Sequence, residues 1–155
     1  MAEPVPSGEV VLREDVLDYT PCPKSVTLAR RRAARLVAEW GYPGLSGDLA
    51  LVVSELAANA VQHGGVSGRL FRVELALTAT VVRVAVSDAR SASLPVQRPV
   101  GPEDTSGRGL LIVRMLAARW DVGKQADRKT VWCELELPER GPSSTGVNRP
   151  GVPRG

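Results

Sequence analysis

Apolar and polar positions change period along this chain, and each period predicts a different kind of element. Between residues 23 and 40, apolar side chains recur every three or four residues, which is the spacing of an amphipathic helix. Gly41 and Pro43 follow directly and predict its end. A second helical pattern runs over residues 46–65, from "SGD" to "HGG". The first half of the folded chain is therefore predicted to be mainly helical.

The period then falls to two. Residues 70–77, 81–88 and 130–138 alternate apolar with polar side chains, and a short strand over residues 10–13 is expected to open the domain. Strands of this kind form a sheet that is covered on one side only. The short "TAT" turn after the first long strand favours antiparallel pairing. We therefore predict an α+β two-layer sandwich, with a mixed, mostly antiparallel sheet, helices on one face and the other face open.

A stretch of more than 20 residues, from Asp88 to Leu110, has neither period. A loop of that length inside a compact domain is usually functional. A third helix is expected to follow over "GLLIVRMLAARW", residues 109–120.

Length and composition fit one folded domain with loose ends. The chain has 155 residues, enough for a single core. Residues 1–9 are predicted to be flexible, residues 10–137 to form the domain, and residues 138–155, which have almost no apolar content, to be a disordered tail. We find no secretory signal and no apolar run close to the roughly 18 residues of a membrane span. The expected compartment is the cytoplasm, with no membrane contact.

Charge and cysteine usage add little chemistry. The formal net charge is +3, a mild excess that makes direct nucleic-acid binding unlikely. Four arginines cluster in "ARRRAAR", at Arg30, Arg31, Arg32 and Arg35, either as a solvated helix face or as a binding surface. Cys22 and Cys133 lie far apart, form no metal-ligand pattern and are expected to be reduced thiols.

Three short stretches hold residues with chemical potential. In "SELAANAVQHGG", Glu55 and Asn59 are one helical turn apart, either on the wet side of an ordinary helix or as two ligands in a pocket. Asp88 ends an apolar strand, where it either binds a ligand or caps a turn. Gly107 and Gly109 lie where the third helix is expected to begin, and helix N-termini favour phosphate.

Together, the motifs "ELAANAVQHG", "VSDARS", "TSGRGLLIV" and "KTVWCELEL" resemble the GHKL (histidine-kinase-like) ATPases, whose Bergerat-type fold binds ATP. Within that group, the chain resembles the small anti-sigma-factor serine/threonine kinases of bacteria. The resemblance covers residues 10–137, nearly the whole predicted domain. One departure is that the motif after Asp88 usually contains two glycines, where this chain has Arg90 and Ala92.

The resemblance implies ATP and Mg²⁺ as cofactors and a role for each motif. Asn59 would coordinate Mg²⁺, and Glu55 would act as the general base. Asp88 would bind the adenine amine, and Thr130 would support the adenine end. Four consecutive residues would wrap the phosphates: Gly107, Arg108, Gly109 and Leu110. No firm role is assigned to His63.

The resemblance also implies a class of partner. An active kinase of this kind would phosphorylate a small anti-sigma antagonist protein, hold a sigma factor, and form a homodimer. The missing glycines after Asp88 keep an alternative open, a GHKL-fold binding module with weak or lost catalysis that regulates transcription through protein partners. Direct nucleic-acid binding through the arginine cluster rests on charge alone and ranks below both.

Overall fold

The computed structural model describes residues 9–64, 69–89, 105–125 and 128–138. Within these ranges, we leave aside the side-chain surroundings of residues 63–64, 89, 105–110 and 125. The flexible segment predicted over residues 1–9 and the tail predicted over 138–155 fall almost wholly outside the described residues.

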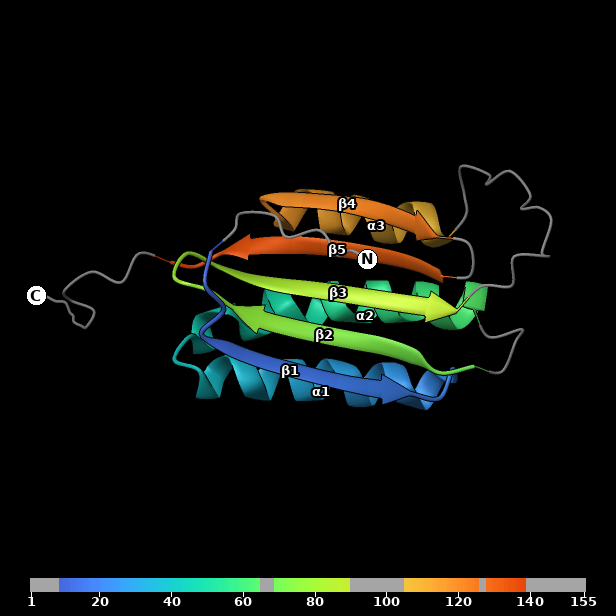
Figure 1. The fold of residues 1–155 in the computed structure, drawn as a ribbon, viewed down its shortest axis with the longest axis horizontal. Helices are drawn as coiled ribbons and strands as arrows, with labels where there is room; N and C mark the ends of the chain where they lie inside the picture. Colours follow the sequence, from blue (N-terminus) through green and yellow to red (C-terminus); the bar gives the residue numbers. More distant parts are fainter. Residues whose placement is uncertain (1–8, 65–68, 90–104, 126–127, 139–155) are drawn as a thin grey trace, which may run out of the picture.

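One antiparallel sheet forms the front layer, and the helices lie behind it (Figure 1). The strand order is β1-β2-β3-β5-β4, and all four neighbouring pairs are antiparallel. The two-layer α+β prediction is therefore confirmed. The elements in chain order are β1 (Arg13–Tyr19), α1 (Pro23–Glu39), the short 3-10 helix η1 (Pro43–Leu45), α2 (Ser46–Gly64), β2 (Phe71–Leu77), β3 (Val81–Ala89), α3 (Thr105–Leu116), β4 (Arg119–Gln125) and β5 (Arg128–Glu136).

The core lies between the two layers. It combines one face of each central strand with the apolar stripes of α1 and α2, as the two periods predict. Its fully buried large side chains include Phe71, Leu49, Leu56, Leu75, Val82 and Val113. Helix α1 ends at Glu39, with Trp40 as its C-cap, and Gly41 follows, as expected. The φ of Gly41 is 107°, a conformation that L side chains rarely adopt. The amide of Tyr42 donates to the carbonyl of Val37 at 2.9 Å and closes that turn.

Two expected elements differ from the structure. The opening strand spans Arg13–Tyr19 and shares only Arg13 with the strand expected over residues 10–13. The Leu12 amide nevertheless donates to the Leu77 carbonyl at 2.6 Å. The third helix spans Thr105–Leu116, and Arg119 and Trp120, which we assigned to its end, begin strand β4 instead. In β4, Trp120 and Val122 pack against the core while Arg119 and Asp121 are exposed. This alternation over "RWDV" is too short to stand out beside the preceding helical pattern.

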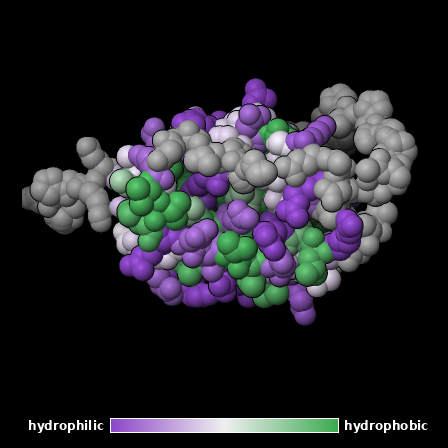
Figure 2. Space-filling view, in the orientation of Figure 1, coloured by the Kyte–Doolittle hydropathy of each residue, from purple (hydrophilic) through white to green (hydrophobic). Residues whose placement is uncertain are grey.

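The outer face of the sheet is less open than the alternating pattern predicted. Figure 2 shows polar and apolar side chains intermixed on this face, with apolar groups along the edge where β1 lies. At its centre, Trp132 is 8% exposed and Glu134 only 2%. Arg83 lies 5.4 Å from the Trp132 ring centroid, and Arg119 lies 3.6 Å from Glu134. These long side chains from neighbouring strands cover one another, which the one-dimensional pattern does not reveal.

The segment Pro43–Gln62 is long and apolar enough to span a membrane by length and mean hydropathy alone. It corresponds to η1 and most of α2. Residues along one side of α2 belong to the core, including Leu49, Val53 and Leu56. The side chains that α2 contributes to the core therefore account for the high mean hydropathy of this segment.

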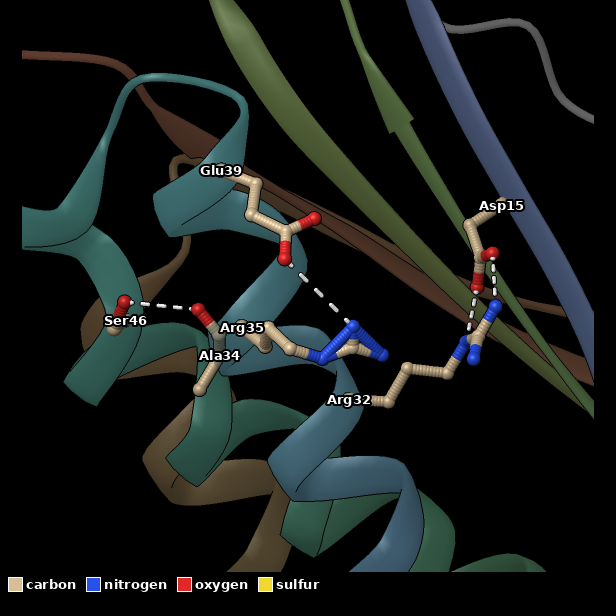
Figure 3. A network of polar contacts seen from close by, with 6 residues as sticks. All are labelled: Asp15, Arg32, Ala34, Arg35, Glu39 and Ser46. Atoms are coloured by element: carbon tan, nitrogen blue, oxygen red, sulfur yellow. Dashed lines mark hydrogen bonds and ion pairs between the residues drawn. The ribbon is translucent and has the colours of Figure 1, made fainter.

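The arginine cluster on α1 is partly used in the fold (Figure 3). Arg32 donates to both carboxylate oxygens of Asp15 on β1, at 2.9 and 2.7 Å. Arg35 lies 3.8 Å from Glu39 on the same helix. On the other side of α1, the Ser46 hydroxyl donates to the Ala34 carbonyl at 3.0 Å and ties the start of α2 to α1. Two of the four arginines therefore have carboxylate partners within the domain.

Candidate functional site

Glu55 and Asn59 lie one turn apart on α2, but their surroundings differ. Asn59 is only 7% exposed, whereas Glu55 is half-buried. The sequence placed both on the polar side of the helix, yet Asn59 lies at the border of its buried stripe. That stripe includes Leu56 and Ala60. An amide side chain buried beside core residues is costly unless a polar group meets it.

Asp88 lies at the end of β3 and is 5% exposed. It shares its face of the strand with Val82, Val84 and Val86, all of which belong to the core. Its side chain is therefore on the inner face, toward the helical layer. An apolar side chain would pack at this position at least as well as a carboxylate. A buried charged residue here therefore points to a polar role for Asp88.

The glycine motif falls inside a helix rather than before one. Gly107, Arg108, Gly109 and Leu110 belong to the first two turns of α3, which begins at Thr105. We expected the glycines at the junction between loop and helix. The side chains of these residues and the roles assigned to them lie outside what the structure describes. What the backbone does provide is the N-terminus of a twelve-residue helix.

Three elements bring these residues to one end of the molecule. The C-terminal ends of α2 and β3 lie together at the right of Figure 1, and α2 packs against β3. Helix α3 lies beside α2. Its end, at Leu116, borders a small cleft that it shares with Asp48 near the start of α2. The two helices are therefore antiparallel, and α3 begins at the end where α2 finishes. Asn59, Asp88 and the N-terminus of α3 converge there.

Thr130 does not join this group. Its partner in the β3–β5 register is Ser87, and their hydroxyl oxygens are 2.8 Å apart. Because neighbouring residues of a strand point to opposite faces, Ser87 and Thr130 lie on the outer face and Asp88 on the inner one. The residue opposite Asp88 is Lys129, which our reading of the closing strand overlooked. Residues two apart in a strand share a face, so the sequence already placed Lys129 on the same face of β5 as Val131 and Cys133.

Three further residues near the site, His63, Arg90 and Ala92, are described only in part or not at all by the structure. His63 lies in the last turn of α2, but its side-chain surroundings are outside the described residues. The same holds for Arg90 and Ala92, which replace the two glycines. Two clefts of about 420 and 200 Å³ that described residues border lie at the other end of the sheet, around Tyr42, Leu45 and Glu136. They are separate from the group around Asp88.

The donor set at this end fits a magnesium nucleotide. A buried carboxylate accepts hydrogen bonds from an amine, an amide oxygen is a hard ligand for Mg²⁺, and a helix N-terminus favours phosphate. In the part of the chain that the structure describes, no three His, Cys, Asp or Glu side chains cluster as a metal site. In nucleotide sites, Mg²⁺ is commonly bound by one or two protein oxygens together with phosphate oxygens and water.

Comparison with known proteins gives the same architecture. The model of the histidine kinase-like ATPase domain matches residues 19–134. The uncharacterized protein SCO4941 of Streptomyces coelicolor is 33% identical over 103 residues, which are 65% of this chain and 94% of that protein.

Two solved structures share the fold. The RsbU and RsbW domains of Rv1364c from Mycobacterium tuberculosis superpose with a TM-score of 0.62 at 20% identity, over 81% of this chain and 33% of that one. This chain thus spans about a third of that protein's length. The SiaB–SiaC complex from Pseudomonas aeruginosa gives a TM-score of 0.57 at 13% identity, over 81% and 89% of the two chains. The family match covers most of the chain and includes Asn59 and Asp88. The chain belongs to the histidine kinase-like ATPase domain family.

Proposed function

We propose that this chain binds ATP with Mg²⁺ and acts as a regulatory protein serine/threonine kinase and anti-sigma factor. Its targets would be a small anti-sigma antagonist protein and a sigma factor. The observation that carries the proposal is the pair of polar side chains, Asn59 and Asp88, which are buried at one end of the mainly apolar core between sheet and helices. The family supports nucleotide binding, and the fold shared with an RsbW domain and with SiaB supports a regulatory role.

Each residue has a stated task in this proposal. The inner-face carboxylate of Asp88 accepts hydrogen bonds from the adenine amine. Asn59 supplies an oxygen ligand to Mg²⁺, and the first turns of α3, at Gly107–Leu110, hold the phosphates. When bound, ATP would supply the phosphoryl group, and Mg²⁺ would neutralise the charge that develops on it. Glu55, one turn before Asn59 and half-buried, accepts the proton of the attacking hydroxyl.

Phosphate transfer from radiolabelled ATP tests the catalytic assignment, with the antagonist proteins of the source organism as acceptors, one at a time. Glu55→Gln keeps the size of the side chain and removes its basicity. We expect transfer to fall by about 100-fold or more while ATP affinity changes little. Unchanged transfer in Glu55→Gln would remove Glu55 from the mechanism.

A second candidate is a binding module with weak or lost catalysis. The residues that favour it are Arg90 and Ala92, which stand in place of two glycines after Asp88. This candidate predicts partner binding that survives Asn59→Ala and needs no Mg²⁺. A strict requirement for nucleotide in partner binding would count against it.

We also propose that the protein is cytoplasmic and forms a homodimer through the β1 edge. Five large apolar side chains are exposed on and just before this edge strand: Val10, Val11, Leu12, Val16 and Leu17. Exposed apolar edge strands are common association surfaces. Light scattering on the parent and on Val16→Lys tests the oligomeric state, and a monomeric parent would exclude the dimer.

Direct nucleic-acid binding is not part of the proposal, since Arg32 and Arg35 have carboxylate partners in the fold.

A further inference from the structure

A row of charged residues crosses three strands at the end of the sheet where Asp88 lies. Asp88 on β3 is the register partner of Lys129 on β5, and Lys129 is the partner of Lys124 on β4. The next row on the same face, nearer the middle of the sheet, consists of three valines in or against the core: Val86, Val131 and Val122. Because residues two apart in a strand share a face, the charged row also lies on the inner face. At this end, the inner face therefore carries one carboxylate and two ammonium groups.

The three charged residues differ in exposure. Asp88 is buried, Lys129 is half-buried and Lys124 is exposed. Like charges directly opposite each other in a sheet are destabilising, so the charge of Lys129 does not favour the pairing of β4 with β5. A half-buried lysine packs its apolar stem and extends its ammonium group well beyond the backbone. Lys129 therefore lies where it brings a positive charge to the space around the Asp88 carboxylate.

Asp88 and Lys129 offer complementary hydrogen-bonding groups. Residues directly opposite across a strand pair have Cβ atoms about 4.5–5.5 Å apart, so both side chains can reach one small ring. An ionised carboxylate only accepts hydrogen bonds, and an ammonium group only donates them. Adenine presents the matching set, because its amine is a donor and the ring nitrogens on either side of that amine, N1 and N7, are acceptors. One edge of an adenine ring thus satisfies both side chains.

We propose that Lys129 is a second residue that reads the nucleotide base, and that it donates a hydrogen bond to the ring nitrogen beside the adenine amine. This inference rests on the proposed function, because it requires the amine to be bound at Asp88. The register of β3 and β5 carries it, since that register places the ammonium group of Lys129 next to the Asp88 carboxylate. The competing explanation is that Lys129 only neutralises the buried charge of Asp88. That explanation predicts no dependence of binding on the ring nitrogens.

Calorimetric affinities for three nucleotides, each with Mg²⁺, separate the two explanations: ATP, 1-deaza-ATP and 7-deaza-ATP. Each analogue replaces one ring nitrogen with a C–H group, which removes one acceptor and leaves the amine in place. We expect the parent to bind one of the two analogues about tenfold or more weakly than ATP, because a hydrogen bond from a charged donor is lost. The analogue that loses affinity identifies the nitrogen that Lys129 contacts.

Lys129→Met removes the ammonium group and keeps a long, unbranched side chain. We expect this variant to bind ATP about tenfold more weakly than the parent, and to bind ATP and the sensitive analogue within about twofold of each other. Lys124→Met is the matched control, because it removes the exposed lysine opposite Lys129. It should keep the parental affinity and the parental preference for ATP. Circular dichroism checks the fold, and Lys129→Val, whose branched side chain suits a strand, replaces a Lys129→Met that does not fold.

The possible failures are distinguishable. A parent that binds ATP and both analogues equally would show that no ring nitrogen is read, and would overturn the inference. Parental preference for ATP retained in Lys129→Met would overturn it as well, because another group would then contact the ring nitrogen. In both cases ATP binding, and with it the proposed function, stands. If the parent binds none of the three nucleotides, the proposed function fails and this inference fails with it.

Discussion

The hydroxyl oxygens of Ser87 and Thr130 lie 2.8 Å apart across strands β3 and β5, on the face of the sheet away from the helices. Asp88, the next residue after Ser87, lies on the inner face and is buried. Strand β3 thus carries a residue of a structural hydrogen-bonded pair, Ser87, on its outer face and a candidate ligand-binding residue, Asp88, on its inner face. We therefore predict that Thr130 serves the pairing of the central strands rather than the proposed nucleotide site.

Thr130→Val is expected to lower the free energy of unfolding by about 1 kcal/mol, because one partly buried hydrogen bond is lost. ATP affinity should stay within about twofold of the parent. Urea denaturation and calorimetry measure the two quantities. Ser87→Ala is the matched control, and the double variant should cost no more than either single change. An ATP affinity that drops sharply in Thr130→Val would return Thr130 to the binding site.

The Arg32–Asp15 pair gives a defined pH dependence. Two hydrogen bonds from Arg32 hold the pKa of Asp15 below its ordinary value of 3.8. Since the carboxylate is favoured in the folded state, the pair stabilises the fold fully above about pH 4 and loses this effect as the pH falls through the lowered pKa. Arg32→Leu should therefore destabilise at pH 7 by about 1 kcal/mol and much less at pH 2.5. Denaturant midpoints at both pH values measure this, and an equal loss at both would contradict it.

The two cysteines are expected to differ in reactivity. Burial raises the pKa of the Cys133 thiol to about 12, whereas hydrogen bonds with Ser25 lower the pKa of Cys22. Iodoacetamide at pH 7.5 should therefore label Cys22 in the folded protein and leave Cys133 unmodified, as read by mass spectrometry. Ser25→Ala should slow the labelling of Cys22. Labelling of Cys133 at a comparable rate would show that β5 opens in the native state.

Asn59 offers a test that separates a ligand from a structural residue. If it serves a nucleotide, Asn59→Ala should leave the free protein as stable as the parent, or more stable by about 0.5 kcal/mol through helix propensity. The rise in melting temperature on adding Mg-ATP should shrink in the variant. Thermal denaturation with and without Mg-ATP measures both effects. A large destabilisation of the free protein would indicate that Asn59 serves packing instead.

The main elements could be predicted because period, glycine and turn residues agree. The α1 stripe, the stop at Gly41 and the hairpin between β2 and β3 all follow from local sequence. β4 was missed because its pattern over "RWDV" is short and continues a helical run. The start of α3 at Thr105 was missed because "TSGRG" contains two glycines, which are poor helix formers.

To predict the site residues, one needs the face of the helix or strand on which each side chain lies, as well as its position in the sequence. Spacing placed Glu55 and Asn59 on one side of α2, but only the packing shows that Asn59 is buried. Asp88 and Thr130 looked equivalent, as polar residues of central strands, until the register assigned them to opposite faces. Alternation within β5 held that information, since Thr130 is one residue out of step with Val131 and Cys133.

The most direct test of the ATP site is the calorimetric affinity for Mg-ATP of the parent, Asp88→Asn and Thr130→Val. Asn keeps the shape of the buried side chain and removes its charge. The account predicts saturable binding to the parent, a loss of about tenfold or more in Asp88→Asn, and parental affinity in Thr130→Val. No binding to the parent, or equal binding to Asp88→Asn, would contradict it.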